Sequence, residues 1–225
     1  MSERATFETR GVLFDLDGTL IDTTYLHTVA WWHAFRQVGL AVSMHRIHRS
    51  VGMGSDHLID AVVDEEHTEE QDDAVRSAHA SIYAMNWPVL QPFPGAQDLV
   101  RRLHGDGLTV VLASSAGSAD LSAAREALQL DDCFTAMTHK ADVERSKPEP
   151  DLLKAALEQS GLRAEDAVFV GDAVWDVEAA NRLDIPSIGL ACGGYSADEL
   201  RTAGAVDVYD NPADLLEHYP FVVQS

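Results

Sequence analysis

Basic residues are scarce in this chain. Lysine and arginine together number 16 among 225 residues, against 37 aspartates and glutamates, which gives a formal net charge of −21. A polyanion such as DNA, or an anionic membrane surface, would be repelled by this charge. Neither nucleic acid nor a membrane is therefore expected as a partner.

Cysteine and long apolar runs are also scarce. The two cysteines, Cys133 and Cys192, form no C-x-x-C pair, so neither a disulfide framework nor a structural zinc site is expected, and a reducing compartment is. Residues 1–10 are polar and mixed in charge, unlike a secretory signal, and no stretch approaches membrane-spanning length. We expect a cytoplasmic protein.

Short apolar runs alternate with longer amphipathic segments along most of the chain. Such runs are typical of buried parallel strands, and apolar residues at three and four spacing are typical of helices. The alternation predicts an α/β fold with a doubly wound, Rossmann-like parallel sheet. The expected strands are Gly11–Phe14, Leu108–Ala113, Ala167–Val170 and Pro186–Ala191, and the expected helices are Gly95–Leu103, Ala119–Leu130, Pro150–Ser160 and Val174–Leu183.

Residues 23–89 interrupt this alternation and offer no convincing strand. We interpret them as an inserted α-helical domain, with residues 1–22 and 90–225 forming the core. Prolines 88, 92 and 94 would stiffen the return to the core, because proline restricts the backbone. The expected helices of the insertion are Tyr25–Val38, Asp56–Val63 and Ala74–Met85.

The first expected strand ends in a group of polar residues. Asp15 and Asp17 leave it on the same side, so their carboxylates crowd together unless a cation or a proton offsets the repulsion. Gly18 permits a tight bend beside them, and Thr19 adds a hydroxyl. Asp-Gly pairs also occur in ordinary turns, so this segment alone does not establish a site.

Three later segments place reactive groups after further expected strands or in turns. Ser114 and Ser115 offer hydroxyls after the second strand, Lys147 lies between turn-forming residues, and Asp172 and Asp176 follow the third strand one helical turn apart. Separately, these residues could be helix caps or surface charges. Asp, Ser, Lys and Asp in this order are hard to attribute to capping.

Together the four segments resemble the motifs of the haloacid dehalogenase superfamily: Asp15 to Thr19, then Ser114, then Lys147, then Gly171-Asp172 with Asp176. The resemblance covers essentially the whole chain. The insertion looks like the small helical cap of the branch that includes phosphoglycolate phosphatases and β-phosphoglucomutases.

This resemblance implies a role for each motif residue. Asp15 is implied as the nucleophile that takes up the phosphoryl group, and Asp17 as the general acid and base. Mg²⁺ is the implied cofactor, held by Asp15, the backbone carbonyl of Asp17, Asp172 and, directly or through water, Asp176. The implied phosphate-binding residues are Ser114 and Lys147, with Gly18, Thr19 and Ser115 beside them.

The residues narrow the choice among the reactions of the superfamily. Dehalogenases lack the acid/base aspartate that Asp17 resembles, and phosphonatases use a cap lysine, whereas the lysines here are Lys140, Lys147 and Lys154. A phosphatase acting on a small phosphorylated metabolite is expected, with a sugar phosphomutase of the β-phosphoglucomutase type as the alternative. A non-catalytic phospho-receiver is disfavoured, because such modules lack Asp17 and the cap. The sequence leaves the oligomeric state open.

The insertion carries one basic segment, His45 to Arg49, which runs into the glycine-containing segment Val51 to Asp56. This arrangement resembles the specificity loop of the cap. We hypothesise that Arg49, with Gly52 in the loop and Arg46 nearby, faces an anionic substrate; a solvated helix face is the alternative. Trp31 and Trp32 could line the same pocket, but we expect them in the core of the insertion, where tryptophan is more often found.

Overall fold

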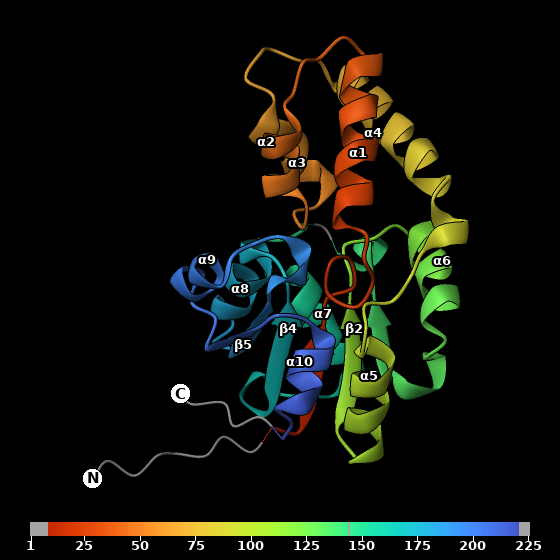
Figure 1. Cartoon of the computed structure of the whole chain (residues 1–225). Coiled ribbons are helices and arrows are strands. Elements are labelled where there is room, and N and C mark those ends of the chain that lie inside the picture. Colours follow the sequence, from red (N-terminus) through yellow and green to blue (C-terminus); the bar gives the residue numbers. More distant parts are fainter. Residues whose placement is uncertain (1–8, 144, 221–225) are drawn as a thin grey trace.

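A parallel sheet forms the centre of the computed structural model, which describes residues 9–143 and 145–220. Its strands lie in the order β3-β2-β1-β4-β5-β6 and all pair in parallel, so the chain crosses from one half of the sheet to the other between β3 and β4 (Figure 1). The strands are β1 (Gly11–Phe14), β2 (Thr109–Ala113), β3 (Ala136–Thr138), β4 (Ala167–Gly171), β5 (Ser187–Leu190) and β6 (Asp207–Tyr209).

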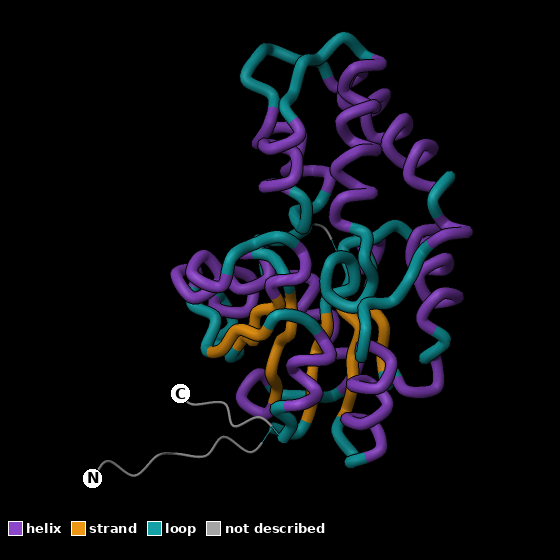
Figure 2. The backbone as a smooth tube through the Cα atoms, viewed as in Figure 1, coloured by secondary structure: helices purple, strands orange, loops and turns teal. Residues whose placement is uncertain are grey.

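Helices cover both faces of the sheet, because alternate residues of the buried strands point to opposite sides. Val12 and Phe14 pack with α5, α6 and α10, whereas Leu13 packs with α7 and α8. The layers are visible in Figure 2. The core helices are α5 (Ala96–Gly105), α6 (Ser118–Leu128), α7 (Asp151–Ser160), α8 (Val174–Asn181), α9 (Ala197–Ala203) and α10 (Pro212–Glu217).

Four helices form a cap between β1 and α5, and Figure 1 shows them beyond one end of the sheet. They bury their own apolar cluster, which includes Trp31, Phe35 and Ile47. No helix in the described part of the chain is both long and apolar enough to cross a membrane. The cap helices are α1 (Thr24–Gln37), α2 (Met44–Ser50), α3 (Ser55–Val62) and α4 (Glu69–Ala84).

Single turns of 3-10 helix connect several of these elements. One of them, η1, joins the cap to the core, and two others carry loops to the edge of the sheet that faces the cap. The turns are η1 (Trp87–Val89), η2 (Asp131–Cys133), η3 (Lys140–Asp142), η4 (Ala164–Asp166) and η5 (Ala191–Gly193).

The expected fold class is confirmed, and each expected strand and helix has a counterpart within a few residues, apart from α4, which begins five residues before its expected start. Several short elements were not predicted: β3, β6, α2, α9 and α10. Strands β3 and β6 lie at the sheet edges and have three residues each, too few for an apolar pattern. The first turn of α4 is polar and is held by a capping box between Thr68 and Gln71.

Leu153 on α7 provides a test of the packing beneath the sheet. It is fully buried, whereas Leu157, one turn later, is only partly buried. We expect Leu153→Ala to lower the free energy of unfolding by about 2–5 kcal/mol, because it removes packed atoms and leaves a cavity. Leu157→Ala should cost clearly less. Urea denaturation measures both, and equal losses would contradict this account of the packing.

Candidate active site

The motif residues meet at the carboxyl ends of the central strands. Phe14 of β1 pairs with Leu112 of β2 on one side and with Val170 of β4 on the other. Because the three strands are parallel and in this register, the residues that follow them emerge at the same edge of the sheet. Asp15, Ser114 and Asp172 are therefore brought together there by the topology.

Lys147 lies between two carboxylates at the centre of this edge. Its ammonium nitrogen donates a hydrogen bond to Oδ1 of Asp15 and lies 2.8 Å from Oδ1 of Asp176. All three side chains are buried. Burial alone would lower the pKa of Lys147, but the two carboxylates outweigh it and raise that pKa above its usual value. Lys147 is thus a fixed positive charge.

Asp172 completes the cluster of carboxylates. Its Oδ1 accepts a hydrogen bond of 2.9 Å from the Thr19 hydroxyl, and one oxygen each of Asp15, Asp172 and Asp176 lie within 4.8 Å of one another. A Cβ added at Gly193 would lie 1.7 Å from Oδ2 of Asp172, so η5 approaches this carboxylate closely. Sequence analysis missed this approach, because Gly193 lies in a connection far along the chain from Asp172.

The charge of the cluster favours a bound divalent cation. Three carboxylates and one ammonium leave an excess of negative charge in a buried place. Burial is the main cause that raises the pKa of Asp15 to about 7 and the pKa of Asp172 well above its usual value, with repulsion from Asp176 adding to both. A hard cation with oxygen ligands, such as Mg²⁺, would offset that repulsion. The residues present therefore fit the cofactor predicted from the sequence.

Asp176 is the most constrained of the three carboxylates. Its Oδ2 accepts backbone N–H bonds from Asp172 at 3.1 Å and Ala173 at 3.0 Å, while Oδ1 pairs with Lys147. It therefore orients both the start of α8 and the lysine.

Asp17 points away from the carboxylate cluster toward the cap. Its Oδ1 accepts a 2.7 Å hydrogen bond from the Thr23 hydroxyl and lies 3.3 Å from Nε2 of His27. Burial raises the pKa of Asp17, but His27 and Thr23 outweigh this effect and lower it. Asp17 is therefore held as a carboxylate next to a potential proton partner.

Two histidines that sequence analysis missed extend this contact into the cap. Nδ1 of His27 on α1 lies 3.2 Å from Nε2 of His79 on α4. His27 stacks on Tyr83 with ring centroids 3.8 Å apart, and His79 stacks on Trp31 at 3.9 Å. Each histidine is isolated in an amphipathic helix, so no spacing in the sequence could have identified the pair.

A pocket of about 220 Å³ lies between the core and the cap over these residues. Trp31 is buried in the cap cluster, as expected, and also lines this pocket. Polar groups reach it from both sides, so a molecule held there would contact both domains. On the core side they are Asp15, Asp17, Ser115, Asp120 and Lys140, and on the cap side His27, Ser55, Arg76 and His79.

The predicted phosphate-binding residues occupy different positions around Asp15. The Ser115 hydroxyl is buried against the pocket and has no hydrogen-bond partner among the described residues. Ser114 is fully buried, and its hydroxyl accepts the N–H of Ala116 at 3.0 Å. Thr19 donates to Asp172. Gly18 has a φ of 84°, and a Cβ there would lie 2.4 Å from Oδ2 of Asp172, so no larger residue fits.

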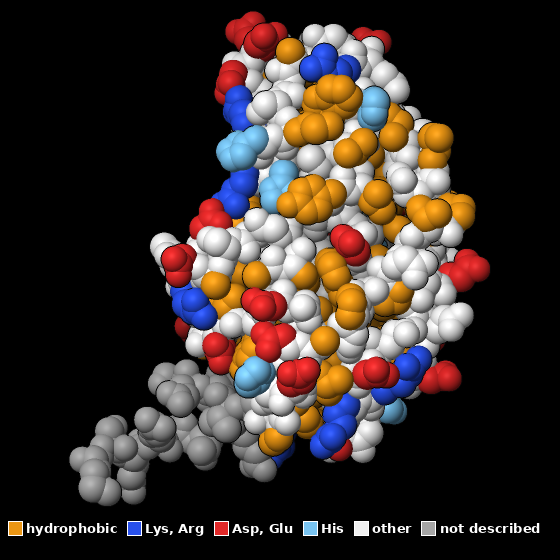
Figure 3. Space-filling view, in the orientation of Figure 1, with side chains coloured by type: hydrophobic (Ala, Val, Ile, Leu, Met, Phe, Trp, Pro, Cys, Tyr) orange, Lys and Arg blue, Asp and Glu red, His pale blue; other side chains and the backbone are white. Residues whose placement is uncertain are grey.

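Arg49 lies at the contact between the cap and the core, outside the set of pocket-lining residues. Its guanidinium pairs with Glu199 of α9 and lies 4.0 Å from the centroid of the Tyr195 ring. Arg46 instead pairs with Asp64 within the cap. Figure 3 shows basic side chains and histidines along the edge of the cap over α2. The predicted contact of Arg49 with substrate stays a prediction.

Gly52 lines the pocket and packs against the core. Its φ is 100°, and a Cβ at this position would lie 2.9 Å from Cβ of Ala173. A side chain would therefore strain the backbone and push the cap loop away from the fourth motif.

Residues 12–190 match a family model described as haloacid dehalogenase-like hydrolase. The chain is 30% identical to the phosphoglycolate phosphatase of Salmonella typhi and 28% identical to that of Escherichia coli K12, and each match covers 92% of this chain and 91% of the relative.

Solved structures agree with this match. A hydrolase from Pseudomonas syringae superposes with a TM-score of 0.90 at 35% identity, covering 94% of this chain and 98% of that one. The β-phosphoglucomutase of Clostridium difficile superposes with a TM-score of 0.80 at 19% identity, covering 92% and 93%, which shows a shared fold.

The contact of Arg49 with Glu199 leads to a prediction. If the ion pair helps to hold the cap on the core, Arg49→Ala and Glu199→Ala should each raise KM by about two- to fivefold. The two rises should be similar, because a partly exposed ion pair contributes about 1 kcal/mol or less. Steady-state kinetics measures both. A much larger rise for Arg49→Ala than for Glu199→Ala would instead support direct contact between Arg49 and the substrate.

Proposed function

Since the chain belongs to the haloacid dehalogenase-like hydrolases, we propose that it is a phosphatase that hydrolyses small phosphate monoesters with bound Mg²⁺ and through a phospho-aspartate on Asp15. One observation carries the proposal: buried Lys147 contacts both Asp15 and Asp176, while Asp172 lies within the same cluster of oxygens. A nucleophile, a fixed positive charge and cation ligands are thus gathered at one edge of the sheet.

Asp15 supplies the nucleophile. Its carboxylate attacks phosphorus, an acyl phosphate bond forms, and the bond between phosphorus and the leaving oxygen breaks. Lys147 touches Asp15 already and would offset negative charge on the transferring phosphoryl group. The Ser115 hydroxyl, which has no partner in the described residues, is available to donate to a phosphoryl oxygen.

Asp17 carries the proton transfers. It passes a proton to the leaving oxygen, which His27 at 3.3 Å is placed to supply, and it then accepts a proton from the water that hydrolyses the acyl phosphate. Thr23 and His27 fix its orientation. The contact of His27 with His79 links this orientation to α4, so the position of the acid and base depends on the cap.

Asp15, Asp172, Asp176 and the backbone carbonyl of Asp17 are the groups that would hold Mg²⁺. When bound, the cation supplies positive charge that stabilises the phosphoryl oxygens and offsets the repulsion among the carboxylates.

The size of the pocket supports a small substrate. Relatives that span most of the chain are named phosphoglycolate phosphatases, and a pocket of about 220 Å³ accommodates a leaving group of a few carbons. We therefore propose a small phosphorylated metabolite as the substrate class.

Substitutions of the two motif aspartates test the roles. We expect Asp15→Asn to reduce hydrolysis of p-nitrophenyl phosphate to background, since an amide does not form the acyl phosphate. We expect Asp17→Asn to reduce kcat by about 10²–10⁴-fold, the range of general acid and base catalysis. Asp98→Asn, an exposed carboxylate on α5, is the control and should retain activity.

Retention of activity by Asp15→Asn would contradict the proposed nucleophile. Glucose 1-phosphate with its bisphosphate activator provides a second check: isomerised sugar phosphate without phosphate release would contradict a phosphatase and indicate a mutase.

Metal removal tests the cation site. We expect EDTA to abolish turnover and Mg²⁺ to restore it. We also expect Mg²⁺ to raise Tm, because a ligand that binds only the folded state stabilises it. Asp172→Asn should remove the rise in Tm, while Asp98→Asn should keep it. Full activity in the presence of EDTA would contradict a metal-dependent reaction.

A further inference from the structure

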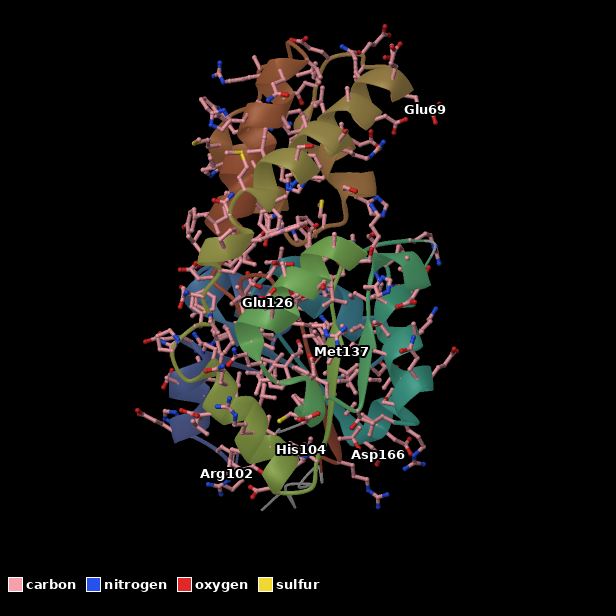
Figure 4. The ribbon with its side chains drawn as sticks, turned by 90° about the vertical axis from the view of Figure 1, so that its right-hand side faces the viewer. Glu69, Arg102, His104, Glu126, Met137 and Asp166 are labelled. Carbon is pink, nitrogen blue, oxygen red and sulfur yellow. The ribbon has the colours of Figure 1, made fainter. Side chains whose placement is uncertain are left out.

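A cluster at the outer end of the cap combines one histidine with two aspartates. It consists of Asp60 of α3, His67 in the connection from α3 to α4, and Asp72 in the first turn of α4. One donor atom of each residue lies within 4.8 Å of the donor atoms of the other two. Figure 4 labels Glu69, the first residue of α4, at the end of the cap remote from the core. The cluster is therefore separate from the active site.

The imidazole ring of His67 lies between the two carboxylates. Its Nδ1 is 2.7 Å from Oδ1 of Asp72, and its Nε2 is 3.6 Å from Oδ1 of Asp60. An ionised carboxylate only accepts hydrogen bonds, so Nδ1 carries the proton in the contact with Asp72. In a neutral imidazole the lone pair is then on Nε2. The electron-pair donor of His67 therefore faces the oxygen of Asp60.

The separation of these two donor atoms suits a metal ion between them. A lone pair and a carboxylate oxygen repel each other unless a cation offsets the repulsion. In zinc sites the bonds to histidine nitrogen and aspartate oxygen are about 2.0–2.2 Å long. Two such bonds span the 3.6 Å between Nε2 of His67 and Oδ1 of Asp60 at an angle of about 120°, near tetrahedral geometry.

Asp72 orients the histidine rather than acting as a further ligand. Its Oδ1 contacts His67, while its Oδ2 lies 3.9 Å from the guanidinium of Arg76. The side chains of His67 and Asp72 are 16% and 14% exposed, so their contact is largely shielded from solvent. Metal-binding histidines commonly donate the other ring N–H to a carboxylate in this way, which fixes the ring. Asp60 is exposed, so water can complete the coordination.

The charge and the donor atoms around His67 indicate the class of cation. Residues 60–73 contain eight aspartates and glutamates and no lysine or arginine. Arg46 pairs with Asp64, and Arg76 pairs with Asp73, which leaves an excess of negative charge. Imidazole nitrogen is a ligand of Zn²⁺ and related transition metals, whereas Mg²⁺ takes oxygen ligands.

We propose that His67 and Asp60 bind a divalent transition-metal cation of the Zn²⁺ class, with Asp72 orienting the imidazole. The bound cation connects the end of α3 to the segment that leads into α4. This site is distinct from the carboxylate cluster around Asp15, and the inference does not depend on the proposed phosphatase function.

Zinc titration of Asp172→Asn tests the site, because this substitution removes one carboxylate of the active-site cluster, and excess Mg²⁺ occupies the oxygens that remain there. We expect isothermal titration calorimetry to show one bound Zn²⁺ per chain. His67→Gln and Asp60→Ala, each added to Asp172→Asn, should abolish this binding. Asp72→Ala should weaken it about 10–100-fold, the usual effect of losing an orienting partner. Circular dichroism without Zn²⁺ checks that each variant is folded.

His104→Gln and Asp98→Asn, added to the same background, are the matched controls. Both residues are exposed on α5, and Figure 4 labels His104 at the end of the core away from the cap. Both variants should bind Zn²⁺ with unchanged affinity.

Imidazole NMR spectra of the unsubstituted protein give a second measurement that does not depend on the stability of the variants. The chain has ten histidines, and Zn²⁺ should shift the ring resonances that disappear in His67→Gln. Mg²⁺ alone should leave those resonances in place. If His67 only pairs with the two aspartates, its resonances should not respond to Zn²⁺.

Absence of Zn²⁺ binding by Asp172→Asn overturns the inference. Equal binding after addition of His67→Gln, or NMR shifts confined to other histidines, also overturns it. The phosphatase proposal is tested separately: in Mg²⁺ without Zn²⁺, His67→Gln and Asp60→Ala should hydrolyse p-nitrophenyl phosphate at the wild-type rate, because the cluster is remote from the reacting groups.

Discussion

The buried contacts of Lys147 with Asp15 and Asp176 are the interaction on which the site depends. Charges removed from water are costly, and a buried ion left without its partner costs about 3–5 kcal/mol. The three residues come from the end of β1, the loop before α7, and α8, so the sheet must hold these segments in register. The order β2-β1-β4 at the centre of the sheet does this, since it places the strand ends side by side. Asp172 adds a further buried carboxylate to this cluster. A divalent cation bound among the three carboxylates would offset their excess negative charge.

Residues of the cap contact the core at several points around the pocket. His27 contacts Asp17, Ser55 contacts Lys140, Gly52 packs on Ala173, and Arg49 pairs with Glu199. These contacts enclose a small volume between the two domains. Enclosure strengthens the electrostatic interactions of a bound anion, because it replaces water by fixed protein groups. Under the proposed mechanism, the cap would limit which leaving groups fit, and the core would supply the groups that react with phosphorus.

The distribution of charge follows this division. Most of the chain is acidic and repels anions, but Lys147 contacts Asp15 at the reacting end of the pocket, and Arg76 and Lys140 line the pocket from the cap and from the core. Positive charge is thus placed locally around the pocket within a protein that repels polyanions elsewhere.

The sequence by itself determined the fold class and the motif residues, because buried strands need apolar runs and reactive groups follow strand ends. Asp15, Asp17 and Asp172 were predicted as site residues in this way, and Lys147 was predicted from its place in a turn. The structure brings them to one edge of the sheet, and their roles stay predictions. Only the tertiary structure decided their partners: Thr19 donates to Asp172, and His27 and His79 connect Asp17 to the cap. The contacts of the basic segment of α2 depended on it as well, since Arg49 reaches Glu199 of α9 whereas Arg46 pairs with Asp64 within the cap. Such contacts join residues that are far apart in the chain. The pattern of residues along one segment does not show which side chains another segment places against it.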